Sequence, residues 1–261
     1  AENAVQPEAK TAPESAAPEE LAALYVDGIR VGDCLLLDGR SYVDPALLCK
    51  ALCREAETLW NAETETLTVR WDGLRMTLRA GDGYFTANDR YFYVQDGVLL
   101  PDGTLRLPIR NFLAAFALEP EWDGENCAVI VESTGLTLPV QSGYNETDLY
   151  WLSRIIHAES GNQPLDGRIG VGNVVLNRVR SESCPDSVYE VIFDRRYGVQ
   201  FTPAATGTIY AEPDELSVIA AKLCLDGCSV VGDSLYFLNP AIGASGWFMR
   251  TRSYVVTIGE H

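Results

Sequence analysis

The residue with the clearest potential for chemistry is Glu159, which stands where a helical pattern requires an apolar side chain. Leu152, Ile155 and Ile156 follow i, i+3, i+4 spacing. Glu159 takes the next position on that stripe, just before Gly161, a residue type that often ends helices. A carboxyl group partly withdrawn from water prefers its neutral form, so we expect the pKa of Glu159 to rise, as suits a general acid. The alternative is that Glu159 marks the solvated end of an amphipathic helix.

Five short motifs follow one another in the C-terminal part of the chain. They are residues 157–164 (HAESGNQP), 170–179 (GVGNVVLNRV), 200–203 (QFTP), 235–240 (LYFLNP) and 257–261 (TIGEH). In order and spacing they resemble the catalytic domain of the spore cortex-lytic, or cell wall hydrolase, family. The resemblance covers residues 147–261. It implies a lysozyme-like fold related to lytic transglycosylases, and it makes Glu159 the catalytic acid.

The chain departs from the family pattern directly after the acid. The family usually reads Arg-Gly-Glu-Pro there, whereas residues 160–164 read SGNQP, so one basic and one acidic residue are lost. Because Glu159 itself is retained, we expect the departure to affect the substrate subtype more than the reaction.

Sugar binding is expected from two amides and three aromatic rings, which are Gln200, Phe201, Tyr236, Asn239 and Trp247. The amides suit N-acetyl groups and the rings suit the faces of sugars. The family motifs support Gln200, Phe201 and Asn239 more than the other two. The alternatives are that Phe201 and Tyr236 belong to the core and that Asn239 only forms a turn.

Three functions remain open. A hydrolytic muramidase needs a second carboxylate, for which Asp166 and Asp194 are the candidates. A lytic transglycosylase needs Glu159 alone. The resemblance implies this second route: Glu159 protonates the oxygen between N-acetylmuramic acid and N-acetylglucosamine, then accepts the proton of the muramyl C6 hydroxyl and leaves a 1,6-anhydro end. Spore cortex during germination is one expected substrate. The third alternative is a non-catalytic protein that binds the cell wall or spore coat.

Composition excludes several classes of partner. The chain has 261 residues and a net charge of −17. Of this charge, −13 lies within residues 1–146, so a phosphate backbone would be repelled and nucleic acid is excluded. No apolar run approaches the roughly 20 residues of a membrane span. With two His and no Cys-x2-Cys pair, we expect no metal and no cofactor. We expect a secreted or wall- or spore-associated protein whose signal peptide is absent from this chain.

The organisation expected is an α+β protein with four parts. Residues 1–22, rich in Ala, Pro and Glu, form a disordered tail, and residues 24–133 form a small α+β module. Residues 134–146 form a linker to a catalytic domain at residues 147–261. Within that domain we expect helices over residues 166–180 and 213–227, with irregular or β structure at residues 197–210. A closing strand is expected around residues 254–258.

The module is predicted to be an internal duplication. Asp38-Gly39 recurs at Asp102-Gly103, and Trp60 recurs at Trp122, at offsets of 64 and 62 residues. Each unit reads as a hairpin, a helix and a returning strand. The module resembles the N-terminal domain of copper amine oxidases but contains no His, so no copper chemistry is expected. A cell-wall or spore-coat partner is expected for it.

Two further features of the sequence leave alternatives open. Five aromatic residues between positions 84 and 93 could form a sugar-stacking platform, but their alternation favours a role in the core. The seven cysteines are expected to be mostly buried small hydrophobes, with one or two disulfide bridges.

Overall fold

A computed structural model of the chain describes residues 20–140, 142–237 and 258. Nearly all of the predicted tail therefore lies outside the described residues, as do positions 254 and 256 of the predicted closing strand. The predicted tail ends too late, because the first strand already begins at Glu20. No helix in this part of the chain combines the length and apolar character needed to cross a membrane.

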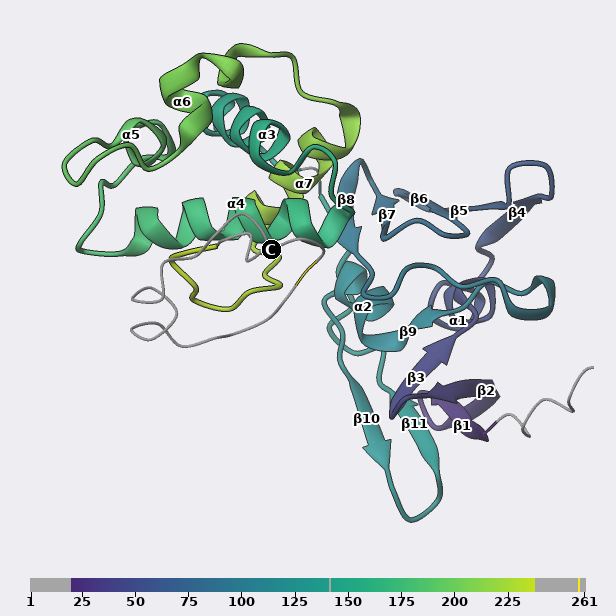
Figure 1. The fold of residues 1–261 in the computed structure, drawn as a ribbon. Helices are drawn as coiled ribbons and strands as arrows, with labels where there is room; N and C mark the ends of the chain where they lie inside the picture. The colour runs from purple at the N-terminus through teal and green to yellow at the C-terminus, as the bar shows by residue number, and fades with distance from the viewer. Residues whose placement is uncertain (1–19, 141, 238–257, 259–261) are drawn as a thin grey trace, which may run out of the picture.

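The module contains two sheets (Figure 1). The first has six strands, in the order β10 (Pro120–Asp123), β11 (Ala128–Val131), β1 (Glu20–Val26), β2 (Ile29–Leu37), β3 (Arg40–Val43) and β9 (Leu107–Pro108). β1 pairs with β11 in parallel, so the last strand of the module returns beside the first. The turn between β1 and β2 uses Asp27 and Gly28, both with positive φ, which matches the twist of a tight hairpin.

The second sheet is antiparallel throughout. Its five strands follow in chain order, β4 (Glu57–Asn61), β5 (Thr66–Trp71), β6 (Leu74–Arg79), β7 (Tyr84–Ala87) and β8 (Arg90–Tyr93). Alternate residues of β6 are buried, as expected for a sheet with one face on a core. One hydrophobic cluster extends from Ala22 to Val131 and joins the two sheets.

Two hairpins of the module pair their strands with the same spacing, as the predicted duplication would require. Trp60 of β4 pairs with Leu67 of β5, and Trp122 of β10 pairs with Val129 of β11, seven residues apart in both hairpins. Each tryptophan lies on the edge strand of its sheet. Each hairpin follows a helix, α1 (Pro45–Leu52) before the first and α2 (Ile109–Leu113) before the second. The 3-10 turn η2 (Ala114–Phe116) directly continues α2, and another 3-10 turn, η1 (Pro101–Gly103), comes before it.

The C-terminal part of the described chain is helical, apart from one isolated β-bridge. Its elements are α3 (Glu146–Ser160), α4 (Leu165–Arg180), α5 (Val188–Phe193), α6 (Thr202–Thr206), the 3-10 turn η3 (Thr208–Tyr210) and α7 (Glu215–Leu225). The expected helix from residue 166 to 180 is confirmed. The expected irregular segment at residues 197–210 instead contains α6 and η3, which are too short to produce a periodic pattern. A helical part beside a β-rich part confirms the α+β class.

Close packing of α3, α4 and α7 explains a glycine inside α4. A Cβ atom at Gly172 would lie 2.7 Å from Sγ of Cys224 on α7 and 2.9 Å from Cδ1 of Ile156 on α3. Glycine costs about 1 kcal/mol in a helix relative to alanine. The expected reason for tolerating it, close approach of another helix, is confirmed at this position.

The β7–β8 hairpin packs on the helical part of the chain (Figure 1). Phe85 and Phe92 are buried in the module, which confirms the predicted role in the core. Tyr84, Tyr91 and Tyr93 point to the other side and pack against the hydrophobic cluster of the helices. These five rings therefore do not form a free sugar platform.

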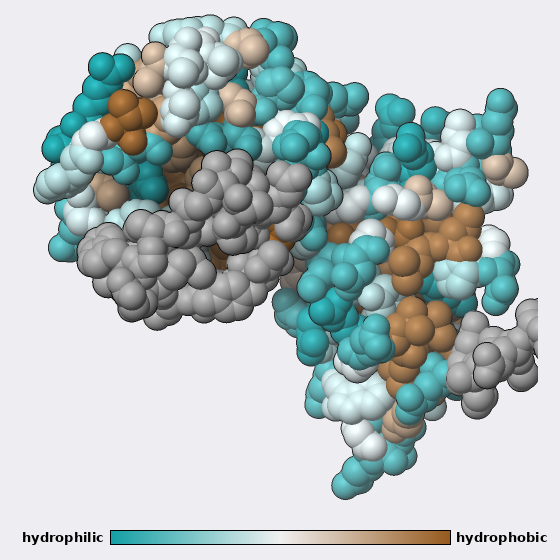
Figure 2. All heavy atoms as spheres, viewed as in Figure 1, coloured by the Kyte–Doolittle hydropathy of each residue, from teal (hydrophilic) through white to brown (hydrophobic). Residues whose placement is uncertain are grey.

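The two parts of the chain differ in the hydropathy of their surfaces. Hydrophobic residues gather on the module around α1, whereas the helical part shows a more hydrophilic surface in the same view (Figure 2).

All seven cysteines are free thiols, and four of them are buried, so the expected bridges are absent. Burial raises the pKa of Cys34 to about 12, which keeps that thiol protonated and unreactive.

Candidate active site

Helix α3 carries the candidate acid at its C-terminal end. The helix begins at Asn145, whose side chain accepts hydrogen bonds from the backbone N–H groups of Thr147 and Asp148 at 2.9 and 3.1 Å. The predicted stripe of Leu152, Ile155 and Ile156 is fully buried. The helix is thus anchored along the face on which Glu159 takes the last position.

Glu159 is half-buried. Desolvation raises its pKa above the ordinary value for glutamate, and no hydrogen bond or charge from a described residue contributes to that shift. The expected rise of the pKa is therefore confirmed in direction and in cause. A carboxyl group in this state can hold a proton at a pH where an exposed glutamate has lost it.

The chain after Glu159 turns sharply. Gly161 has helical dihedral angles, and a Cβ atom there would lie 2.5 Å from the carbonyl oxygen of His157. His157 points to α7, where its Nδ1 accepts a hydrogen bond from the backbone N–H of Asp214 at 3.4 Å. His157 therefore supports the helix packing, and glycine keeps room for the turn.

Arg178 of α4 joins two of the predicted sugar-binding residues. Its guanidinium group lies 5.1 Å from the ring centre of Phe201 and 5.3 Å from that of Tyr236, and its Nε donates to the carbonyl of Leu235 at 2.8 Å. Sequence reasoning did not single out Arg178, although it lies within the second family motif. Both rings are thereby held against the C-terminal end of α4.

The five predicted sugar-binding residues have different surroundings. Tyr236 is exposed and Gln200 is half-buried, with its amide donating to the carbonyl of Gly198 at 3.2 Å. Phe201 is 1% exposed and belongs to the core, so the expectation that its ring faces a sugar is not met. Asn239 and Trp247 lie outside the described residues.

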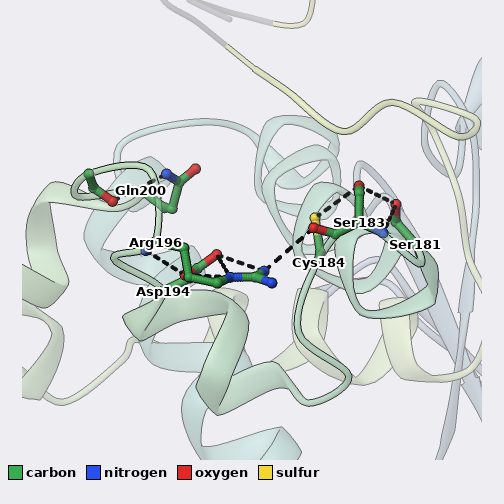
Figure 3. A network of polar contacts seen from close by, with 7 residues as sticks. Ser181, Ser183, Cys184, Asp194, Arg196 and Gln200 are labelled. Carbon is green, nitrogen blue, oxygen red and sulfur yellow. Dashed lines mark hydrogen bonds and ion pairs between the residues drawn. The ribbon is translucent and has the colours of Figure 1, made fainter.

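Both candidates for a second carboxylate accept hydrogen bonds from neighbouring side chains. Asp194 is bound by Arg196, whose Nη2 donates at 3.0 Å, and hydrogen bonds from Arg196 hold the pKa of Asp194 below its ordinary value (Figure 3). Arg196 also reaches the carbonyl of Ser183 and so ties this turn to the end of α4. Asp166 accepts a hydrogen bond from Tyr93 of the module at 2.9 Å. Each carboxylate already has a structural partner.

A surface hollow of about 420 Å³ lies beside α5 and does not include Glu159. Its lining includes Tyr189, Phe193 and Arg195. Across the described part of the chain, no group of three or more His, Cys, Asp or Glu side chains is arranged to hold a metal ion.

Comparison with known proteins relates the two parts of the chain to two families. Residues 162–261 match the family model described as Cell Wall Hydrolase, which begins three residues after Glu159. Residues 27–131 match the model described as Copper amine oxidase N-terminal domain. Both resemblances expected from the motifs are confirmed.

The curated relatives match about half of this chain. The spore cortex-lytic enzyme of Oceanobacillus iheyensis is 35% identical over 132 residues, which are 50% of this chain and 46% of that protein. The enzyme of the same name from Bacillus cereus is 36% identical over 122 residues, or 47% and 46% of the two chains. This chain therefore spans about half the length of the curated relatives it matches.

Among solved structures, one match is the catalytic domain of the germination-specific lytic transglycosylase SleB from Bacillus anthracis. It is 36% identical, covers 46% of this chain and 96% of that domain, and has a TM-score of 0.41. The catalytic domain of the Bacillus cereus SleB protein matches with 36% identity, the same TM-score, and 47% and 92% coverage.

Proposed function

Because residues 162–261 belong to the cell wall hydrolase family, we propose that this protein cleaves the glycan strand of peptidoglycan between N-acetylmuramic acid and N-acetylglucosamine. The observation that carries the proposal is the half-buried carboxyl group of Glu159, whose pKa is raised by desolvation at the end of α3. The relatives named as spore cortex-lytic enzymes support the same substrate class.

The proposed reaction needs one acid. Glu159 donates its proton to the glycosidic oxygen, which becomes the leaving group. The resulting carboxylate then accepts the proton of the muramyl C6 hydroxyl as that oxygen closes the 1,6-anhydro ring. Atoms and charge balance without water, and Glu159 ends the cycle protonated. The lytic transglycosylase among the solved relatives supports this route.

Hydrolysis is less well supported. It requires a second carboxylate close to the first, as nucleophile or as base for a water molecule. Asp194 is bound by Arg196, and Asp166 is bound by Tyr93. These structural partners favour the route with a single acid in this proposal.

Binding of the glycan strand is assigned to Gln200 and Tyr236, with Asn239 and Trp247 added from the sequence. Gln200 offers its amide to N-acetyl groups, and Tyr236 offers an exposed ring to a sugar face. Phe201 is given no sugar contact in this proposal, because its ring is buried in the core. Arg178 holds Tyr236 in place through its guanidinium group, which lies 5.3 Å from the centre of the tyrosine ring.

The names of the relatives favour spore cortex, and germination, over the vegetative wall as the setting. We place the protein outside the cytoplasm on the same ground, in the wall or the spore. For the module, we propose a wall or spore-coat partner bound at its sheet edges. Trp60 and Trp122 are 45% and 49% exposed at equivalent positions of the two hairpins, which is unusual for such large rings.

The test is digestion of purified cortex and purified vegetative peptidoglycan by the full chain, followed by mass spectrometry of the released muropeptides. The proposal predicts products lighter than the reducing muropeptides by one water molecule, released preferentially from cortex. Reducing ends would replace the transglycosylase route with hydrolysis. Absence of release from either substrate would leave a non-catalytic binding protein.

A further inference from the structure

Arg168, in the first turns of α4, is a buried charge with an unusual set of partners. Its side chain is 6% exposed. A buried guanidinium group is stable only when its N–H groups are paired. Two of its hydrogen bonds go to backbone carbonyls, those of Gly161 and of Gln163, the latter at 2.9 Å. The other two go to α7, to Ser217 Oγ at 2.7 Å and to the carboxylate of Asp214.

The carbonyl groups that Arg168 binds belong to the turn that directly follows Glu159. The last carbonyls of a helix have no partner within the helix and need one from outside. Gln163 is itself buried, and a Cβ atom at Gly167 would lie 2.9 Å from that of Gln163. The turn is therefore close against α4 and is bound to it by the guanidinium group of Arg168.

The α7 side of the network is equally well defined. Asp214 caps α7 by accepting a hydrogen bond from the backbone N–H of Ser217 at 2.9 Å. Burial acts to raise the pKa of Asp214, but hydrogen bonds from Arg168 and Ser217 outweigh it and lower the pKa to about 2. Asp214 thus stays charged and pairs with Arg168 across the working pH range. Arg168 thereby links the end of α3 to the start of α7.

We propose that Arg168 is a positioning residue for the acid, because it fixes the turn at residues 161–163 and so holds Glu159 half withdrawn from water. This inference rests on the proposed function of Glu159. It adds a role for a residue that does not touch the glycan. If the turn were free to move away from α4, water would reach the carboxyl group and the desolvation that raises its pKa would be lost.

The chemistry of the network requires arginine. The planar fork of arginine can donate in several fixed directions at once, whereas lysine presents a compact charge on a flexible chain. Lysine at this position can keep the ion pair with Asp214 but cannot also reach both carbonyls. R168K therefore keeps the positive charge beside Asp214 but removes the paired hydrogen bonds to the carbonyl groups of Gly161 and Gln163.

The experiment compares the full chain with the variants R168M and R168K, using soluble glycan fragments of peptidoglycan as substrate. R180M is the matched control, because Arg180 is an exposed arginine at the far end of the same helix. For each protein, kcat, KM and the pH dependence of kcat are measured, together with the Tm.

We expect R168M to lower kcat by about 100-fold, the scale of a misplaced catalytic group, with KM little changed. The alkaline limb of the kcat profile, where the acid loses its proton, should move to lower pH. R168K should recover part of kcat and part of the limb position, and R180M should match the wild type.

Three outcomes decide the matter. Unchanged kcat in folded R168M, or a lower kcat with an unmoved limb, overturns the positioning role while the proposed function stands. If R168M fails to fold, the alkaline limb of the kcat profile of R168K decides instead, and an unmoved limb there overturns the positioning role. If the wild type releases no product at all, the proposed function fails first, and that result is distinct from either variant result.

Discussion

Tyr93 of the module donates its hydroxyl hydrogen to the carboxylate of Asp166 on α4, with 2.9 Å between the oxygens. One contact thus changes two expectations from the sequence. The tyrosines of the β7–β8 hairpin lie against the helices and not against a sugar. Asp166, a candidate for the second acid, accepts a hydrogen bond from one of them. The neighbouring contact of Arg90 with Asp226, at 3.6 Å, reinforces the docking of the module.

Removing the Tyr93 hydroxyl should weaken this docking. We expect Y93F to lower the free energy of unfolding by about 1 kcal/mol, because a part-buried hydrogen bond is lost and Asp166 keeps its need for a partner. Urea unfolding measures the change. Y197F is the control, since Tyr197 is exposed and should show no effect. Equal stability of Y93F and the wild type would contradict the role of this contact.

Neutralising the two carboxylates considered as a second acid, Asp166 and Asp194, should leave the products unchanged. We expect D166N and D194N to release the same 1,6-anhydro muropeptides as the wild type, since neither group acts on the sugar. D166N keeps an oxygen that can accept from Tyr93, so its fold should be retained. A switch in product ends, or loss of release from a folded D166N protein, would identify a second catalytic acid.

Stability should depend on pH through Glu159. Its folded pKa is raised, so its contribution to stability is fully present below the unfolded pKa and is lost as the pH rises through the folded pKa. E159Q removes this dependence. We therefore expect E159Q to match the wild type in acid and to become the more stable protein toward neutral and alkaline pH, as urea unfolding at a series of pH values would reveal. A constant difference at every pH would argue against a desolvated carboxyl group.

The tight contact at Gly172 makes a prediction about packing. We expect G172A to destabilise the protein by about 1–3 kcal/mol, because the added methyl group must displace Cys224 and Ile156. G170A is the matched control. A Cβ atom there lies 3.4 Å from Val231, an ordinary contact, so the gain of up to about 1 kcal/mol in helix propensity should dominate. The opposite order of Tm values would refute the close packing of α4.

Local features of the site could be predicted from the sequence. The buried stripe of Leu152 and Ile155, and the raised pKa of Glu159 at its end, follow from helical periodicity within a single segment. The duplication stays a prediction from the paired tryptophans and the Asp-Gly pairs. Apart from the end of the tail, which β1 corrects, the boundaries of the four predicted parts stay a prediction.

What could not be predicted depends on distant contacts. Arg168 reads as a solvated charge until Asp214 and Ser217, nearly fifty residues later, are brought beside it. Phe201 lies in a motif that the family resemblance links to sugar binding, yet its ring is buried, and burial depends on the whole helical core. Short elements such as α6 carry too few residues to show a period.

The central claim is that Glu159 is the single acid of the reaction. The most direct measurement is the rate of muropeptide release from cortex peptidoglycan by E159Q and by the wild type, with binding to the same insoluble peptidoglycan measured in parallel. We predict that E159Q loses release while its binding and its fold are retained, because glutamine keeps the shape of the side chain without a transferable proton. Release by E159Q at a rate comparable to the wild type would contradict the account.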